Sequence, residues 1–282
     1  MLKIENELLT ARINPVGAEL SSLIKNATGR EYIWQAEPSV WGRHAPLLFP
    51  AVGRMSGDSF LYDGKKYFMQ KHGFLRGSSF EVIEKSDDSV TLRFSSNEKT
   101  LMSFPFEFDF DAEYSLWGNT LVQKLTVTNK GEGNMYFSVG AHPGFNIGIG
   151  DTLRFETPEH ATLPYLDGND TVGNPENKLI LDGETDIVLS KELFENGSLA
   201  LEAPASTYAE LVGSDGVPYL RETFGKTPML WLWAKPGAEF VCIEPWSGSD
   251  ERVPTEELEN KKGILCLAPS QSFTLSVSIS LL

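Results

Sequence analysis

Apolar and polar residues alternate with a period of two along much of the chain. In the C-terminal segment 273–281, apolar residues occupy every second position, and Ser or Thr fills the positions between them. Phe106, Phe108 and Phe110 alternate with acidic residues in the same way. Because alternate side chains of a strand point to opposite faces, this pattern predicts half-buried β-strands.

Three pairs of such segments flank residues that favour turns. Segments 80–84 and 90–94 flank a Ser-Asp-Asp-Ser sequence, and segment 60–67 contains Asp-Gly at its centre. Segments 121–129 and 135–142 flank a Lys-Gly-Glu-Gly-Asn sequence. Turn residues between two strand-like runs predict β-hairpins.

Helical signals are weak, and only segment 97–103 and segment 191–196 could hold a turn or two. The 25 Gly and 16 Pro residues are spread evenly, as turns between many short strands require. Segment 151–186 has the least regular pattern and is expected to form long loops. With no break in composition, residues 1–282 predict an all-β protein with a single large antiparallel β-sandwich domain.

Composition restricts the partners and the compartment. A net charge of −15 disfavours binding to nucleic acid or to anionic membranes. The same charge repels an anionic substrate as it approaches the protein. The N-terminus lacks a basic start followed by an apolar run, and no stretch approaches the ~18 apolar residues of a membrane span, so we expect a cytoplasmic protein. Cys242 and Cys266 lie in apolar strands and are expected to be buried, without a disulfide or a metal.

Two strand-like segments end in a titratable residue that is followed directly by proline. His142 follows the segment 135–141 and precedes Pro143, and Glu244 follows the apolar segment 240–243 in the same manner. Each residue alone is more often structural than catalytic. A His and a Glu brought to one sheet edge would, however, form a general acid and a general base, so we expect them to face each other across one cleft.

A third group of polar residues follows the apolar segment 47–52. Gly53 and Arg54 follow that segment, and His72 and Arg76 lie in the sequence KHGFLRG. Solvated charges would explain both arginines, and a core histidine with a backbone partner would explain His72. These residues alone therefore assign no function.

The order of these motifs resembles the aldose 1-epimerase (galactose mutarotase) family, and it is most similar to the LacX-like branch. The motifs are LLFPAVGR, KHGFLRG, GAHPGFN and FVCIEPWSG. The resemblance covers nearly the whole chain and implies a galactose mutarotase-like β-sandwich without metal or organic cofactor. It also implies that Glu244 is the general base, that His142 is the general acid, and that Arg54 and His72 bind the substrate.

Two further residues, Arg76 and Trp246, are candidates for substrate binding. The sugar-binding Asp that the family carries between the second histidine and the glutamate has no match, since the nearest segment, 194–196, lacks an Asp. This departure leaves the identity of the sugar open.

Three hypotheses follow. The first is an aldose 1-epimerase that acts on a free aldose, which the net charge favours. The second is a sugar-phosphate mutarotase, which requires Arg43, Arg54, Lys71 or Arg76 to converge. The third is a non-catalytic carbohydrate-binding protein with the same fold. A glycosidase is disfavoured because it needs two carboxylates at a defined separation, and only Glu244 is available. The expected partner is a small-molecule sugar, and a homodimer remains open.

Overall fold

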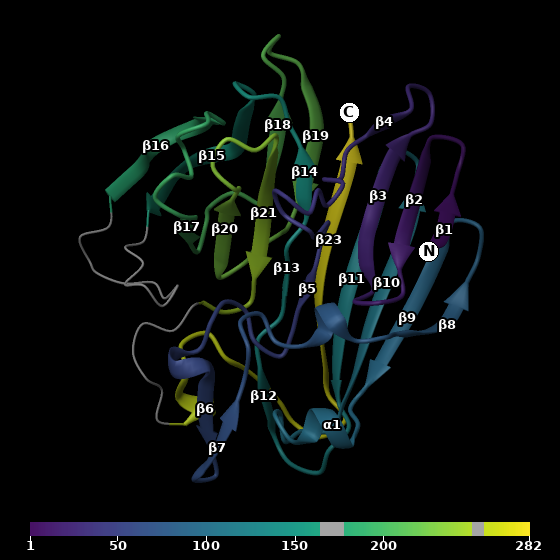
Figure 1. Ribbon diagram of the computed structural model, residues 1–282, viewed down its shortest axis with the longest axis vertical. Coiled ribbons are helices and arrows are strands. Elements are labelled where there is room, and N and C mark those ends of the chain that lie inside the picture. The colour runs from purple at the N-terminus through teal and green to yellow at the C-terminus, as the bar shows by residue number, and fades with distance from the viewer. Residues whose placement is uncertain (164–177, 250–256) are drawn as a thin grey trace.

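Strands dominate the computed structural model, which describes residues 1–163, 178–249 and 257–282 (Figure 1). The large antiparallel sheet contains, in spatial order, β5 (Leu47–Leu48), β13 (Gly140–Ala141), β21 (Phe240–Trp246), β20 (Met229–Trp233), β17 (Leu199–Glu202), β15 (Thr152–Leu163), β18 (Tyr208–Val212), β19 (Pro218–Thr223), β23 (Ser272–Leu281), β11 (Thr120–Asn129), β10 (Phe108–Trp117), β9 (Ser89–Ser95) and β8 (Glu81–Lys85). Beside this path, β14 (Gly144–Asn146) pairs with β21, and β16 (Lys178–Val188) pairs with β15.

Smaller elements complete the described fold. A second sheet contains β1 (Leu2–Glu5), β2 (Leu9–Asn14), β3 (Glu19–Lys25) and β4 (Arg30–Glu31). Two-stranded sheets form from β6 (Ser59–Tyr62) with β7 (Lys65–Phe68), and from β12 (Met135–Phe137) with β22 (Leu265–Leu267). Helix α1 (Glu98–Leu101) is short, as are the 3-10 helices at Ser56–Asp58, Leu75–Gly77 and Leu258–Asn260.

The two larger sheets pack face to face and bury the core between them. Along β10, buried and partly exposed residues alternate as the sequence pattern predicts, and β2 alternates in the same way. The sheet of β1 to β4 lies over β9 and β10 in Figure 1. The buried Tyr114 hydroxyl of β10 donates a hydrogen bond to the Ala18 carbonyl, 2.6 Å away, and so ties the layers together. The expected all-β class with a large antiparallel sheet is confirmed.

Two of the three predicted hairpins are confirmed. β8 pairs with β9, and β6 pairs with β7 through Asp63 and Gly64, which both have positive φ. The third hairpin is wrong, because β11 pairs with β10 and β23, whereas β12 pairs with β22. Ser138 interrupts the predicted strand 135–142, since its amide donates to the Pro50 carbonyl and its hydroxyl accepts from Val52.

The prediction of loops in segment 151–186 is also wrong. Most of its described part belongs to β15 and β16, which pair with each other over their length. The pairing contains several register shifts, and these break the alternation that marks a strand in a sequence. The middle of the segment, 164–177, lies outside the described residues.

The two cysteines differ in their surroundings. Both are free, but Cys242 is buried whereas Cys266 is exposed, so the expected burial of Cys266 is wrong. Cys266 lies in β22, whose sole described partner is the short strand β12. Within the described parts of the chain, no helix has the length and apolar character needed to cross a membrane.

Candidate active site

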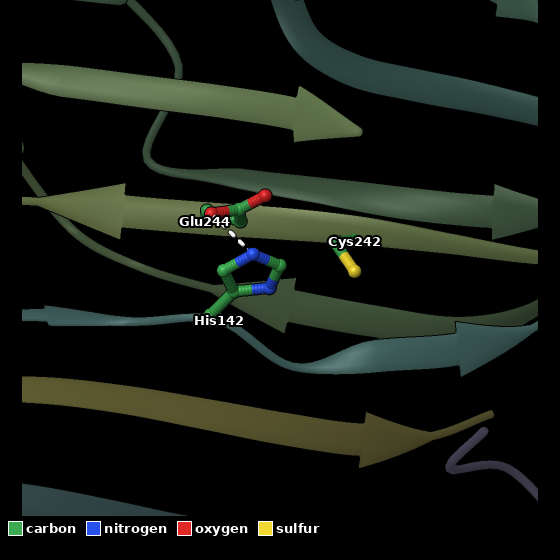
Figure 2. Close-up of side chains that lie close together, drawn as sticks. All are labelled: His142, Cys242 and Glu244. Carbon is green, nitrogen blue, oxygen red and sulfur yellow. Dashed lines mark ion pairs between the residues drawn. The ribbon is translucent and has the colours of Figure 1, made fainter. Parts of the chain in front are cut away.

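His142 and Glu244 are brought together by the register of β13, β14 and β21. Gly140 of β13 pairs with Trp246, and Gly144 of β14 pairs with Cys242, so His142 lies opposite Glu244. Nε2 of His142 is 3.1 Å from Oε2 of Glu244 (Figure 2). Both residues are buried. The two side chains are thus adjacent, rather than on opposite sides of a cleft as the sequence suggested.

The prediction that each strand ends at its proline holds for β13, which ends at Ala141 directly before His142 and Pro143, and is wrong for β21. The chain leaves β21 after β13 and returns to it as β14, while β21 continues through Pro245 to Trp246. A proline removes one backbone donor, and a strand tolerates this loss at a local irregularity. The prolines therefore mark a gap in the ladder at His142 and not a sheet edge.

His72 reaches the same place from a turn between β7 and the 3-10 helix at Leu75–Gly77. Its amide donates to the Gly53 carbonyl at 2.7 Å, and its Nδ1 accepts from the Gly53 amide at 3.1 Å. Because Nδ1 is the acceptor, the proton of the neutral ring is on Nε2. The ring packs edge-on against the rings of His142 and Trp246, each with a centroid separation of 5.6 Å.

These residues line a cavity of about 390 Å³. Its walls also contain Trp41, Trp231 and Trp233, and Trp41 stacks on the His142 ring with the centroids 5.2 Å apart. Pockets of several hundred Å³ that combine aromatic walls with a few polar groups are typical of small-ligand sites. Aromatic faces also suit the apolar face of a sugar ring.

Burial holds both cavity histidines in the neutral form. It lowers the pKa of His142 to about 3, and the positive charges of Lys71 and Arg76 act in the same direction. Burial also lowers the pKa of His72 well below its ordinary value, followed by the effects of His142 and the nearby cations. His72 can therefore donate from Nε2 without carrying a charge.

Cys242 adds a third donor atom beside the pair. It lies on the same face of β21 as Glu244, and the donor atoms of His142, Cys242 and Glu244 lie within 4.8 Å of one another (Figure 2). Sequence spacing did not reveal this set, because Cys242 faces a histidine a hundred residues away. Burial raises the pKa of the Cys242 thiol well above its usual value, and Glu244 and Glu222 act in the same direction, so the sulfur remains a thiol.

The predicted substrate-binding residues are divided between two hollows. His72, Arg76 and Trp246 line the cavity of His142 and Glu244. Arg54 instead lines a neighbouring hollow of about 560 Å³, where its Nε lies 3.7 Å from Oδ1 of Asp58. Lys71 and Arg76 line both hollows.

Comparison with known proteins places this chain in a family. The profile of the aldose 1-epimerase family matches residues 1–202. The chain belongs to the aldose 1-epimerase family. A galactose mutarotase-related enzyme from Lactobacillus acidophilus superposes with a TM-score of 0.92 at 31% identity, over 100% of this chain and 97% of that one. A galactose mutarotase-like protein from Lactobacillus casei gives 0.91 at 28% identity, over the full length of both chains.

The resemblance to the LacX-like branch is also confirmed. The chromosomal protein LacX of Lactococcus lactis is 29% identical to this chain. The match covers 100% of this chain and 99% of LacX. The family match includes His72 and His142, whereas Glu244 lies beyond it.

Sequence reasoning missed Trp41 as part of the site. Trp41 has no periodic neighbours in its irregular segment, and it reaches the cavity because its ring stacks on Phe240 and His142. Arg43 and Lys71 were considered only for a phosphate, yet both line the cavity.

Proposed function

We propose that this protein is an aldose 1-epimerase that interconverts the α and β anomers of a sugar by general acid–base catalysis. The observation that carries the proposal is the 3.1 Å contact between His142 Nε2 and Glu244 Oε2 in the wall of a cavity with aromatic sides. A buried acid–base pair beside a space of ligand size is the arrangement that ring opening requires.

In the proposed reaction, the Glu244 carboxylate removes the proton from the anomeric hydroxyl of the sugar. The electron pair of that oxygen forms the aldehyde carbonyl as the bond from C1 to the ring oxygen breaks. The ring oxygen takes a proton from His142. Rotation about the C1–C2 bond then presents the other face of the aldehyde, and ring closure reverses both proton transfers.

The acid must first gain a proton beyond that of the neutral ring. Burial opposes this gain, and a negative charge on the Glu244 carboxylate 3.1 Å from Nε2 would favour it. An imidazolium with a low pKa is a strong acid and releases its proton readily to the ring oxygen. His72, with its Nε2 proton directed by the Gly53 contact, can stabilise negative charge on a sugar oxygen.

The test is the rate of anomer exchange in Glu244→Gln and in His142→Asn. Polarimetry or NMR exchange on a panel of aldoses should show a loss of about a hundred- to ten-thousand-fold in each variant, the usual contribution of general acid–base catalysis. Rates are normalised to the folded fraction, because both residues are buried.

Matched controls carry the same substitutions on the surface. Glu84→Gln lies on exposed β8, and His160→Asn removes a side chain that is 70% exposed. Both should retain the wild-type rate. A wild-type rate per folded molecule in Glu244→Gln would refute Glu244 as the base. Sugar binding by the wild-type protein without exchange above the uncatalysed rate would favour the non-catalytic carbohydrate-binding protein.

A further inference from the structure

Among the described residues, three cationic side chains line the cavity that contains His142 and Glu244. We propose that Arg43, Lys71 and Arg76 bind an anionic substituent, a phosphate or a carboxylate, carried by the sugar that occupies this cavity. The inference rests on the proposed function in one respect, namely that the rest of the ligand is a sugar ring.

Hydrogen bonds to backbone carbonyls hold the two arginines in place. Arg43 Nη1 donates to the Arg76 carbonyl at 3.0 Å, and Arg76 Nη2 donates to the Lys71 carbonyl at 3.1 Å. The guanidinium groups are therefore oriented before any ligand arrives. Preorganised guanidinium donors match the oxygen geometry of phosphate and carboxylate.

Glu19 partly balances the positive charge of the two arginines. Glu19 Oε2 lies 3.4 Å from Arg43 Nη1, while Glu19 Oε1 accepts from the amides of His44 and Ala45. Arg76 forms no ion pair with any carboxylate among the described residues. Glu19 thus compensates Arg43 by direct contact and Arg76 only through a longer-range attraction.

The pKa shifts around the three cations agree with this arrangement. Burial lowers the pKa of the half-buried Arg76, and the like charge of Arg43 lowers it further. Lys71 and Arg76 also contribute to the lowered pKa of His72 and of His142. An anion beside Arg76 would relieve this repulsion.

The local charge is opposite in sign to that of the whole protein. The chain carries a net charge of −15, yet Glu244 is the single carboxylate among the described residues that line the cavity, and it contacts His142. Lys71 and Arg76 lie where the cavity meets the hollow that Arg54 lines. An anionic group held there leaves the sugar ring beside the catalytic pair.

The reaction limits where the substituent can be attached. Ring opening requires a free anomeric hydroxyl, so the anionic group must be on another carbon. Substituents on C6 are suitable probes, because glucose and galactose can each be compared with the 6-phosphate and with the uronate of the same sugar.

Isothermal titration calorimetry with the full-length protein tests the inference without relying on turnover. We expect the 6-phosphate to bind at least tenfold more tightly than the neutral sugar, the size of effect that a hydrogen bond to a charged group provides. The preference should decrease as salt is added. Tight binding of the uronate as well would show that the site accepts any anion, whereas weak binding of the uronate would identify a phosphate site.

Arg76→Gln should reduce the preference to less than threefold. Arg12→Gln is the control, since Arg12 is exposed on β2 and lies outside both hollows. Thermal melts establish folding of each variant, and Lys71→Gln replaces Arg76→Gln if the latter does not fold.

Two results would overturn the inference. One is equal affinity of the wild-type protein for charged and neutral sugars, and the other is a preference that persists in the folded Arg76→Gln or Lys71→Gln protein. Failure of anomer exchange on every sugar would refute the proposed function and leave these binding results readable. Fast exchange of neutral sugars, without tighter binding of charged ones, would support the proposed function and refute the anion-binding site.

Discussion

Cys242 is the buried residue of the site for which the proposed reaction has no use. Its sulfur, an imidazole nitrogen and a carboxylate oxygen lie within 4.8 Å of one another, which resembles the donor set of a zinc site. Zinc, however, binds the thiolate, and burial raises the pKa of this thiol well above its usual value. The Glu244 oxygen is already in contact with His142 Nε2.

We therefore expect anomer exchange to be independent of metal. Exhaustive chelation should leave the rate unchanged, and Cys242→Ala should retain a rate within about threefold of wild type while losing about 1 kcal/mol of unfolding free energy, as expected for removal of a small buried group. Polarimetry and metal analysis of the purified protein provide the measurement. Activity lost on chelation and restored by zinc, with the restoration absent in Cys242→Ala, would reverse this assignment.

At the residue scale, the sequence identified His142 and Glu244 because each follows an apolar strand and precedes a proline. It could not show that the two side chains touch, since a direct contact depends on the register of β13 and β14 against β21. Trp41 was not predicted for a related reason. Its position follows from stacking on Phe240, a contact between segments two hundred residues apart.

At the element scale, the turn that carries His72 depends on one glycine. Gly73 has a φ of +68°, and an added Cβ would lie 2.0 Å from the Phe49 carbonyl oxygen. The same carbonyl accepts a hydrogen bond from the Phe74 amide at 3.1 Å. The backbone of the turn thus lies directly against the segment after β5, which leaves no space for a side chain.

Gly73→Ala should lower the unfolding free energy by about 2–5 kcal/mol, since it combines an unfavourable φ with overpacking. Gly64→Ala is the matched control. It has a similar φ of +67° but no atom within 4 Å of the added Cβ, so it should cost only about 1–2 kcal/mol. Urea denaturation measures both values. If both variants lose the same unfolding free energy, the close approach to Phe49 does not contribute to the cost of Gly73→Ala.

The prediction of elements succeeded where local pattern decides the structure. The hairpin of β6 and β7 was predicted from its Asp-Gly turn, and β23 from its strict alternation. The prediction failed for segment 135–142, where the partners of Ser138 are Pro50 and Val52, residues distant in sequence. Contacts of that kind leave no periodic signal.

At the scale of the whole molecule, a strand in the middle of the large sheet carries a second buried carboxyl group. Glu222 of β19 is fully buried, and neither of its oxygens has a hydrogen-bond partner among the described residues. Burial raises the pKa of Glu222 well above its usual value, and the charge of Glu244 raises it further. The folded protein thus retains a proton that the unfolded chain releases above about pH 4.5.

This difference makes stability dependent on pH. A group whose pKa is raised in the folded state contributes to the unfolding free energy fully at a pH below its unfolded pKa. As the pH rises towards the folded pKa, the unfolding free energy falls by up to about 1.4 kcal/mol per pH unit. The side-chain amide of the Glu222→Gln variant does not titrate in this pH range, so the variant lacks this loss of stability. Its unfolding free energy minus that of wild type should therefore grow between pH 5 and pH 8 in urea titrations.

The histidines do not disturb this comparison. The lowered pKa values of His72 and His142 reduce stability below about pH 6.5, but they do so in both proteins and cancel in the difference. Glu84→Gln on exposed β8 should give a difference that does not depend on pH. A flat difference for Glu222→Gln would mean that its carboxyl is ionised in the folded protein.

The groups proposed for proton transfer and those proposed for holding an anion have different structural supports. His142 and Glu244 are fixed by the pairing of β13 and β14 with β21 in the large sheet, whereas Lys71 lies in a turn and Arg76 in the short 3-10 helix that follows it. Substitutions in this turn and helix could change which sugar is accepted while leaving the reacting atoms in register. Directed evolution of a new substrate range could therefore begin with libraries confined to residues 71 and 76, with β13, β14 and β21 held constant.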